Sequence, residues 1–373
     1  MHERHPQILK WEWIAATGVV LAGLACGPLG ASPTATPTPA PTATEVPTEV
    51  PTQPAQSFQG GSDASPVAAT GINASNVVNI QELWSFDVSQ TALLATSASP
   101  VNHDIATFGG DSIVRIWDGD AASLVLEMPR LANYGFGLAY SPDGSVLASG
   151  AGFVVTLWDA ATGERLRETI VNADVFRIVW TPDSSALAVV GNNSSRIIVI
   201  DPYSGEVVTE IPSPDRLVLW SIAFSPDGRL MATSNVNGNV RVTDIDSGNY
   251  VYEDLTIAHG AGWDLEFSPD GSRLASCNGS GGVWIWDTST WQIDLSGEDV
   301  HPGGCTDGVF SRDGSVYFSV GDDGDLNAWD TSTGDLLTYL SAEQAIWTVS
   351  ITGDGELLGL ALDNGTLSVV GLP

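Results

Sequence analysis

Basic residues are scarce in this sequence: 13 lysines and arginines stand against 45 aspartates and glutamates, for a formal net charge of −32. A chain this acidic repels the phosphate backbone of DNA and RNA, because nucleic-acid binding depends on neutralising phosphates with lysine and arginine. Nucleic acid is therefore excluded as a predicted partner. The acidity is interpreted as a source of solubility, and attraction of a cation or a basic partner is the alternative.

Histidine and cysteine are also rare, with five and three copies. The sequence has no HExxH, no paired CxxC and no glycine loop that opens a helix to hold phosphate. The stretch 322–325 (DDGD) lacks the alternating ligand spacing of a calcium loop. No catalytic residue, metal or cofactor is predicted, although carboxylates are too numerous for a glycosidase-like pair to be assessed from the sequence.

Long hydrophobic runs are absent apart from residues 13–25 (WIAATGVVLAGLA), which are too few to span a bilayer comfortably. Arg4 and Lys10 precede this run and Cys26 follows it, an order that resembles a bacterial lipoprotein signal cut before a lipidated cysteine. Gly23 departs from that pattern, which usually has an aliphatic residue there. Residues 1–25 are predicted to be a lipoprotein-like signal, with Cys26 as the membrane attachment. Simple secretion and an uncleaved anchor are the alternatives, and all three place the rest of the chain outside the cytoplasm.

Residues 26–71 are rich in proline and threonine, most clearly in residues 32–54 (SPTATPTPAPTATEVPTEVPTQP). Frequent proline removes backbone donors and favours the extended polyproline II conformation. At about 3.1 Å per residue, such a segment reaches on the order of 100 Å. It is interpreted as a disordered tether between the membrane and the domain formed by residues 72–373.

From residue 99 onward the sequence repeats two short motifs in one register. The first is a Trp-Asp pair that begins at Trp117, Trp158, Trp286 and Trp329, with degenerate copies at Ile200, Thr243 and Val370. The second is a Ser-Pro-Asp-Gly turn, kept or modified at 141–144, 181–183, 225–228, 268–271, 311–314 and 352–355. Proline presets φ and glycine accepts a positive φ, so each copy predicts a turn between strands. Successive copies lie 41 to 43 residues apart, a period typical of a four-stranded propeller blade.

These motifs resemble the WD40-repeat family, which is named for its terminal Trp-Asp, and the resemblance covers residues 77–373. It implies an all-β, seven-bladed propeller around a channel. The last copy stops one strand short of a blade, while residues near Ile80 to Phe86 precede the first inner strand. This N-terminal strand is therefore predicted to complete the final blade, which protects the sheet edges. We expect the propeller to be monomeric.

Members of this family often link a histidine, a serine or threonine, an aspartate and the tryptophan of one blade in a buried hydrogen-bond chain. The sixth copy has the complete set: His301, Ser319, Asp323 and Trp329. The resemblance implies a structural role for these four residues, because such a chain stiffens the blade. His103 lies on the turn of the first repeat and has no predicted partner.

An aromatic register runs through the repeats, five residues before the serine or threonine of each turn. Its members are Leu94, Phe136, Phe176, Trp220, Trp263, Thr306 and Trp347. In a propeller this position falls at the start of each inner strand, beside the channel rim on which WD40 proteins commonly bind partners. Together with Tyr134, and with Asp322 and Asp363 on nearby turns, the rim is predicted to be an aromatic, acidic surface for a protein or peptide. The alternative is that these aromatic side chains only pack between blades.

Two cysteines remain besides Cys26. Cys277 ends a second strand and Cys305 begins the next blade, so a disulfide between blades is conceivable in an exported protein. Two buried free thiols are nevertheless the preferred prediction.

Two classes of function follow from these observations. The preferred one is a non-enzymatic interaction platform, tethered outside the cytoplasm, that docks a protein or peptide on the channel rim. The alternative is a glycan- or small-molecule-binding propeller or a propeller enzyme, including a quinoprotein-like one, because residues 159–163 (DAATG) resemble turns of quinoprotein repeats. The Ser-Pro-Asp-Gly turns and the Trp-Asp endings favour the first class.

Overall fold

The computed structural model describes residues 71–213, 215–256 and 260–373. The predicted signal, the tether up to residue 70 and the proposed lipid attachment at Cys26 lie outside the described residues. Within those ranges, no helix is long and apolar enough to cross a membrane. The helical structure found there is a short 3₁₀ turn, η1 (Val77–Asn79), just before the first strand.

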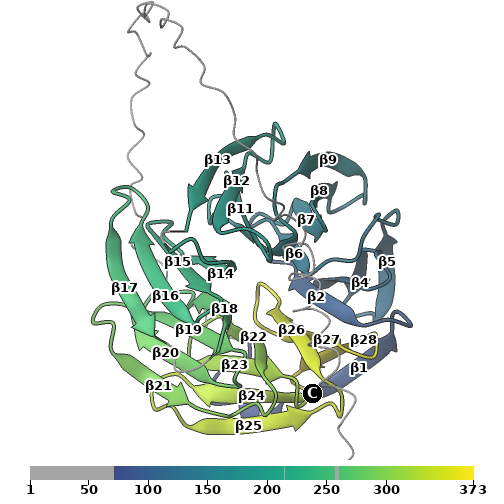
Figure 1. Cartoon of the computed structure of the whole chain (residues 1–373). Helices are drawn as coiled ribbons and strands as arrows, with labels where there is room; N and C mark the ends of the chain where they lie inside the picture. Colours follow the sequence, from purple (N-terminus) through teal and green to yellow (C-terminus); the bar gives the residue numbers. More distant parts are fainter. Residues whose placement is uncertain (1–70, 214, 257–259) are drawn as a thin grey trace, which may run out of the picture. The chain divides into compact units, whose positions relative to one another are not determined.

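The described residues form seven antiparallel sheets of four strands each, arranged as blades around a channel (Figure 1). From the channel outward, blade 1 contains β2 (Leu93–Ala98), β3 (Asp104–Gly109), β4 (Arg115–Asp118) and β5 (Ser123–Glu127), and blade 2 contains β6 (Gly137–Tyr140), β7 (Val146–Ala151), β8 (Val154–Asp159) and β9 (Arg165–Ile170). Blade 3 contains β10 (Val175–Trp180), β11 (Leu187–Gly191), β12 (Arg196–Ile200) and β13 (Val207–Pro212), and blade 4 contains β14 (Leu219–Phe224), β15 (Leu230–Asn235), β16 (Asn239–Asp244) and β17 (Tyr250–Thr256). Blade 5 contains β18 (Gly262–Phe267), β19 (Arg273–Asn278), β20 (Val283–Asp287) and β21 (Ile293–Gly297). Blade 6 contains β22 (Cys305–Phe310), β23 (Val316–Gly321), β24 (Asp325–Asp330) and β25 (Leu336–Ser341). Blade 7 contains β26 (Ile346–Ile351), β27 (Leu357–Leu362), β28 (Thr366–Gly371) and, as its outermost strand, β1 (Gln81–Asp87). The prediction of a seven-bladed, all-β propeller is confirmed.

The turn between the first and second strand of a blade is held by its own side chains. Between β18 and β19, Ser268 Oγ donates to Asp270 Oδ1 (2.7 Å) and accepts from the Arg273 amide (2.9 Å). Gly271 has a φ of 71°, a left-handed conformation that glycine adopts without a Cβ clash. The same bond from hydroxyl to aspartate begins at Ser141, Thr181, Ser225, Ser311 and Thr352 in other blades. We call the end of the propeller that carries these turns the turn face.

The Trp-Asp motif fixes the bend between the third and fourth strands of the blade. Asp287 Oδ1 accepts from the Ser289 hydroxyl (2.6 Å) and from the Thr290 amide (2.8 Å), and these bonds lower the pKa of Asp287 to about 2. The preceding Trp286 is buried with apolar side chains of blades 4 and 5. One dipeptide thus supplies a turn and part of the core between blades.

The ring closes through the N-terminal strand. β1 pairs with β28 in antiparallel register from Gln81 opposite Gly371 to Asp87 opposite Thr366. Trp84 Nε1 also donates to the Gly119 carbonyl of blade 1 (2.8 Å). The predicted completion of the last blade is confirmed, and blade 7 is built from both ends of the described chain.

Cys277 and Cys305 form a disulfide between β19 of blade 5 and β22 of blade 6. Both residues are fully buried, and their Cα atoms lie 5.2 Å apart, within the range that a disulfide requires. The preference for two free thiols is therefore wrong. The second strand of blade 5 approaches the innermost strand of blade 6 closely enough for a covalent link, which the sequence spacing alone did not determine.

A candidate binding rim at one end of the channel

The aromatic register lies at the end of the channel opposite the turn face. Phe176, Trp220, Trp263 and Trp347 are the second residues of β10, β14, β18 and β26, and Phe136 immediately precedes β6. Each inner strand then runs to its turn about 15–20 Å away, given a rise of roughly 3.3 Å per residue. We use the term aromatic rim for Tyr134, Phe136, Phe176, Trp220, Trp263 and Trp347, together with Asp322 and Asp363.

Four rings of the aromatic rim form a continuous arc. The centroids of Phe136 and Phe176 lie 5.2 Å apart, and those of Phe176 and Trp220 lie 4.8 Å apart. Phe136 also contacts Trp347 of blade 7 edge-on at 6.4 Å. This contact passes over blade 1, where the register has the smaller Leu94. The arc therefore joins blades 7, 2, 3 and 4 through aromatic contacts at distances typical of favourable ring pairs.

Tyr134 extends this arc toward solvent. Its ring lies 6.0 Å from that of Phe136, and 57% of the residue is exposed. The other aromatic residues of the rim are half-buried. The same aromatic side chains therefore pack between blades and are partly exposed at this end of the channel.

Trp263 lies between two loops that contain glycine. A Cβ on Gly279 would come within 2.8 Å of its ring, and a Cβ on Gly304 would come equally close. Neither approach is possible for a residue with a side chain unless the ring moves. The two glycines therefore let the indole lie against backbone at the side of the rim opposite Phe136.

The acidic part of the rim lies on blades 6 and 7. Trp347 Nε1 donates to Asp363 Oδ1 (3.2 Å), which couples the aromatic arc to this carboxylate. Burial, together with the nearby carboxylates of Asp323 and Asp363, raises the pKa of Asp322 to about 7. Asp322 therefore titrates near neutral pH, and the charge of the rim depends on pH.

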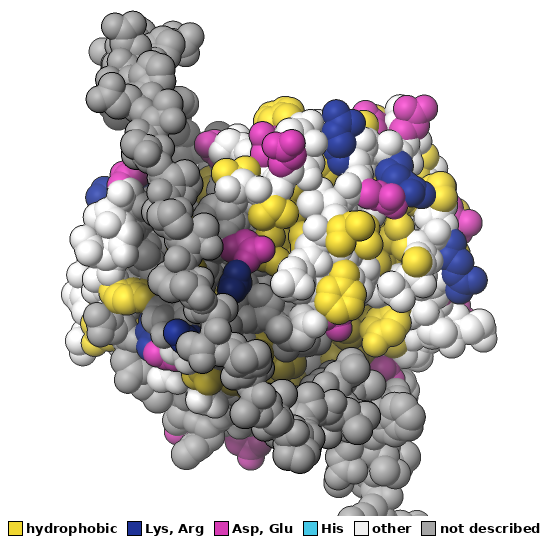
Figure 2. Space-filling model, turned by 45° about the horizontal axis from the view of Figure 1, so that its top comes forward, with side chains coloured by type: hydrophobic (Ala, Val, Ile, Leu, Met, Phe, Trp, Pro, Cys, Tyr) yellow, Lys and Arg dark blue, Asp and Glu magenta, His cyan; other side chains and the backbone are white. Residues whose placement is uncertain are grey.

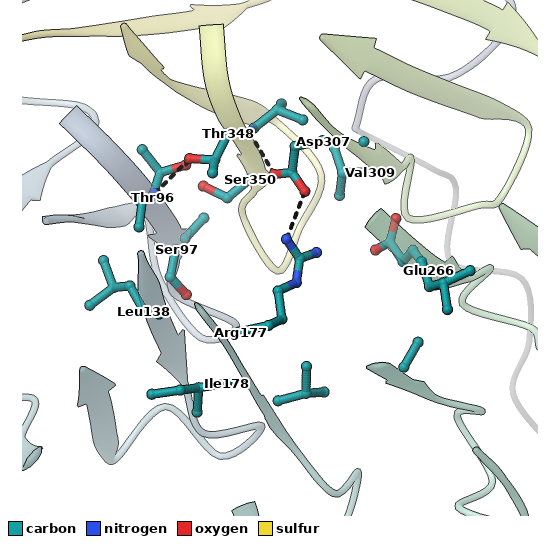
Figure 3. Close-up of a pocket in the computed structure, with 18 of the residues that line it drawn as sticks. Thr96, Ser97, Leu138, Arg177, Ile178, Glu266, Asp307, Val309, Thr348 and Ser350 are labelled. Atoms are coloured by element: carbon teal, nitrogen blue, oxygen red, sulfur yellow. Dashed lines mark hydrogen bonds and ion pairs between the residues drawn. The ribbon is translucent and has the colours of Figure 1, made fainter. Parts of the chain in front are cut away.

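A cavity of about 420 Å³ lies along the channel axis, lined by the inner strands of all seven blades (Figure 3). Phe136 belongs to its lining, so the aromatic rim and the cavity are continuous. Directly after the rim position in sequence come Arg177, Asp264 and Asp307, on blades 3, 5 and 6. This charged layer was not predicted from the sequence.

Arg177 extends across the channel toward Asp307, as Figure 3 shows, and pairs with it at 3.1 Å. It also forms an ion pair with Asp264, which is fully buried. The second oxygens of the two aspartates accept backbone amides, from Val349 to Asp307 (2.9 Å) and from Gly308 to Asp264 (3.1 Å). One arginine thus links three blades beneath the rim.

Burial dominates the electrostatics of this layer. It raises the pKa of Asp264 to about 7 and raises that of Asp307, although the charge of Arg177 acts in the opposite direction on both. Glu266, two residues further along β18, also has a raised pKa because of burial and of the neighbouring carboxylates. Its Oε2 accepts the Phe310 amide (2.8 Å). The cavity is therefore lined by two carboxyl groups, those of Glu266 and Asp307, and by the Arg177 guanidinium, which also pairs with the fully buried Asp264.

The four residues assigned to the blade network are connected in series in blade 6. His301 Nδ1 lies 3.0 Å from Asp323 Oδ1, and its Nε2 lies 2.8 Å from Ser319 Oγ. Trp329 Nε1 donates to the same hydroxyl (2.9 Å). Since His301 is completely buried, this chain connects the rim end of the blade to its core. His259, the corresponding histidine of blade 5, lies outside the described residues.

Basic side chains stand singly among acidic, apolar and polar ones on the visible part of the face drawn in Figure 2. No continuous basic strip is visible among the described residues of that view.

Comparison with known proteins points to one repeat family. The family model described as WD domain, G-beta repeat matches residues 205–244 and 253–287, which contain most of blades 4 and 5. The chain is similar to the WD repeat-containing protein slp1 of Schizosaccharomyces pombe, with 28% identity over 37% of this chain and 29% of the relative. It is also similar to small ribosomal subunit protein RACK1 of Neurospora crassa (26% identity, 39% of this chain, 48% of the relative) and to eukaryotic translation initiation factor 3 subunit I of Drosophila willistoni (21%, 45%, 56%).

The matched segments span between 29% and 56% of these relatives' own lengths. Together with the seven-bladed ring, the matches support the WD40-repeat family for this chain. Propellers of that kind typically serve as scaffolds for protein interaction.

Proposed function

We propose that this chain is a non-enzymatic WD40-type interaction platform that docks a protein or peptide on its aromatic rim. The observation that carries the proposal is the arc of half-buried rings, with centroids 4.8 to 6.4 Å apart, at the open end of the channel. Large, rigid aromatic side chains contribute most of the binding free energy in many protein interfaces. The names of two relatives describe them as subunit proteins, which agrees with a role in assemblies.

The partner that suits this surface carries basic residues beside an apolar segment. Asp322 and Asp363 lie next to the arc, and the chain as a whole has a formal charge of −32. Such a field attracts a basic partner over distances of about a Debye length, roughly 8–10 Å at physiological salt. The rings would then supply the apolar contact.

Export and tethering complete the proposal. They are supported by the sequence pattern of residues 1–71, with Cys26 as the lipid attachment. The Ile72 amide donates to the Gly355 carbonyl (2.8 Å), so the chain joins the propeller at the turn face.

The test is affinity isolation from cell-envelope extract with the full chain, followed by measurement of the dissociation constant for the isolated partner. The substitutions Trp220→Ala, Trp263→Ala and Trp347→Ala, combined in one variant with a wild-type circular dichroism spectrum, should weaken binding at least 100-fold, since each hot-spot residue contributes about 2 kcal/mol or more. The matched control is Tyr203→Ala with Tyr339→Ala, two exposed aromatic residues outside the rim. Equal binding by the triple variant and the control would reject the rim as the docking surface.

A second candidate function is favoured by the cavity beneath the rim. Its volume of about 420 Å³ is in the range of small-molecule sites, and Arg177 and Glu266 provide polar groups inside it. This propeller would then bind a glycan or small molecule, or act as an enzyme on it. Saturable binding of an oligosaccharide, or copurification of a cofactor with visible absorbance, together with loss of either in Glu266→Gln, would favour this function over protein docking.

A further inference from the structure

A second cluster of side chains lies on the turn face, where the ring closes between blades 7 and 1. It consists of His103 and Asp120 from blade 1 and of Asp354 and Glu356 from blade 7. The Gly353 amide donates to the Ser99 carbonyl (3.0 Å), which holds the two turns side by side. We call these four residues the closure cluster. It is separate from the aromatic rim, at the other end of the channel.

Two members of the closure cluster depart from the repeat at the same position. The fourth residue after the serine or threonine of the turn is Ser145, Ser185, Arg229, Ser272 and Ser315 in blades 2 to 6. It is His103 in blade 1 and Glu356 in blade 7. The turn itself does not require either side chain, because serine satisfies it in four copies. Arg229 of blade 4 is a third departure, but His103 and Glu356 are the two that lie in the blades meeting at the ring closure.

The geometry of His103 is that of an oriented imidazole. Its Nδ1 lies 2.7 Å from Asp120 Oδ1, while its Nε2 contacts Asp354 Oδ2 and lies 3.9 Å from Glu356 Oε2. One ligand atom from each of His103, Asp354 and Glu356 lies within 4.8 Å of the others. Histidine ligands of metals commonly donate the other ring N–H to a carboxylate, which fixes the tautomer. Asp120 is placed to accept that proton.

The carboxylates are also held in place. Asp354 Oδ1 accepts from the Thr352 hydroxyl (2.7 Å) and the Glu356 amide (3.0 Å), which leaves Oδ2 directed at the imidazole. The Asp120 amide is bound by Asp118 Oδ1 (2.9 Å). The side chains of His103, Asp354 and Glu356 are 22%, 40% and 43% exposed. A bound ion would therefore be reached from solvent and could keep water as a further ligand.

We propose that His103 Nε2, Asp354 and Glu356 bind a divalent transition-metal ion of the zinc class, with Asp120 orienting the imidazole. A mixed set of one nitrogen and two carboxylate oxygens suits zinc better than calcium or magnesium, which take oxygen ligands. The ion joins blade 7, which contains both ends of the described chain, to blade 1. It therefore strengthens the ring at its closure, next to the point where Ile72 enters the propeller.

The test uses the full chain after treatment with a chelator, titrated with zinc chloride in an isothermal calorimeter. We expect one zinc ion per chain, with affinity reduced at least 10-fold in His103→Gln and in Glu356→Gln. Asp120→Asn should reduce affinity by about 10- to 100-fold, as loss of an orienting partner does at other metal sites. Glu164→Gln removes one exposed carboxylate from a turn of blade 2 and should leave binding unchanged.

A thermal scan provides the second measurement. Zinc should raise the melting temperature of the wild type and of Glu164→Gln equally and that of Glu356→Gln by less at the same zinc concentration, because an ion that binds the folded state stabilises it in proportion to its binding free energy. Absence of saturable binding would overturn the proposal and leave the cluster as an ion-pair network. Zinc binding that persists unchanged in both His103→Gln and Glu356→Gln would also overturn it, because the ion would then occupy other ligands such as His2, His5 or Cys26.

Discussion

The two ends of the propeller differ in how far they follow the repeat. On the turn face, nearly every blade has the same hydroxyl–aspartate bond, from Ser141 to Thr352. At the rim, the corresponding residues of the blades are leucine, phenylalanine, tryptophan and threonine, and the layer beneath contains one arginine and two aspartates. Repetition therefore marks what the fold requires, and variation marks where a specific surface can be built. The closure cluster fits this rule, because it is a departure within the repetitive face.

The largest expected effect comes from breaking the charged layer beneath the rim. Arg177→Met leaves Asp264 and Asp307 buried without their cation, and this should lower the free energy of unfolding by about 3–5 kcal/mol. Urea denaturation at pH 8 measures it. Arg165→Met removes an exposed pair with Glu168 and should cost below about 1 kcal/mol. If the two substitutions lower the unfolding free energy equally, the charged layer stabilises the fold no more than an exposed ion pair does.

Breaking the hydrogen-bond network of blade 6 should cost less stability. Ser319→Ala leaves His301 Nε2 and Trp329 Nε1 without their common partner, and the loss should be about 1–3 kcal/mol of unfolding free energy. Ser296→Ala, on the exposed outer strand β21, is the control. Chemical denaturation of both variants measures the difference. If Ser319→Ala loses no more unfolding free energy than Ser296→Ala, the network does not stabilise the blade.

A small change at the rim should disturb one aromatic side chain. In Gly279→Ala the new Cβ would meet the ring of Trp263 at 2.8 Å, so the indole must move, at a cost of about 1–2 kcal/mol. Fluorine NMR of the chain labelled with 5-fluorotryptophan, with Trp263 assigned by Trp263→Phe, should show a shift of that resonance. An unchanged Trp263 resonance would contradict the packing described for this part of the rim.

The smallest effect concerns pH. Asp322 has a pKa of about 7 in the folded state, above its ordinary value of 3.8, so the folded state holds this proton more tightly than the unfolded chain. Its contribution to stability is therefore present below about pH 4 and is lost as the pH rises through 7. Asp322→Asn should reduce the fall in melting temperature between pH 5 and pH 8 by about 2 °C. Asp299→Asn, an exposed control, should leave that fall unchanged, and an identical fall in wild type and Asp322→Asn would contradict the prediction.

Much of the fold could be predicted because local chemistry repeats at a constant spacing. The turn and the Trp-Asp ending each form bonds within a few residues, as in Ser268 to Asp270 and Asp287 to Thr290, so their sequence signal is sufficient. The register of the rim followed from the same spacing, and the structure brings Phe136, Phe176 and Trp220 together. Their role in binding stays a prediction.

Features that join different blades could not be predicted. Arg177 meets Asp264 and Asp307 across the channel, and nothing in the local sequence of a strand such as β10 shows which charge lies opposite. His103 and Asp354 come from the first and last blades, so no sequence motif contains them both. The disulfide was misjudged for the same reason, since the 5.2 Å between the Cα atoms of Cys277 and Cys305 depends on how two blades pack.

The central claim is that the aromatic rim is the docking surface, and site-specific photocrosslinking tests it most directly. A photoreactive phenylalanine analogue would replace either Tyr134, 57% exposed at the rim, or Tyr203, 76% exposed between β12 and β13 on the turn face, in the full chain expressed in its own cells. Our account predicts one discrete crosslinked protein from position 134 and none from position 203. Crosslinks from position 203 alone, or the same products from both positions, would contradict it.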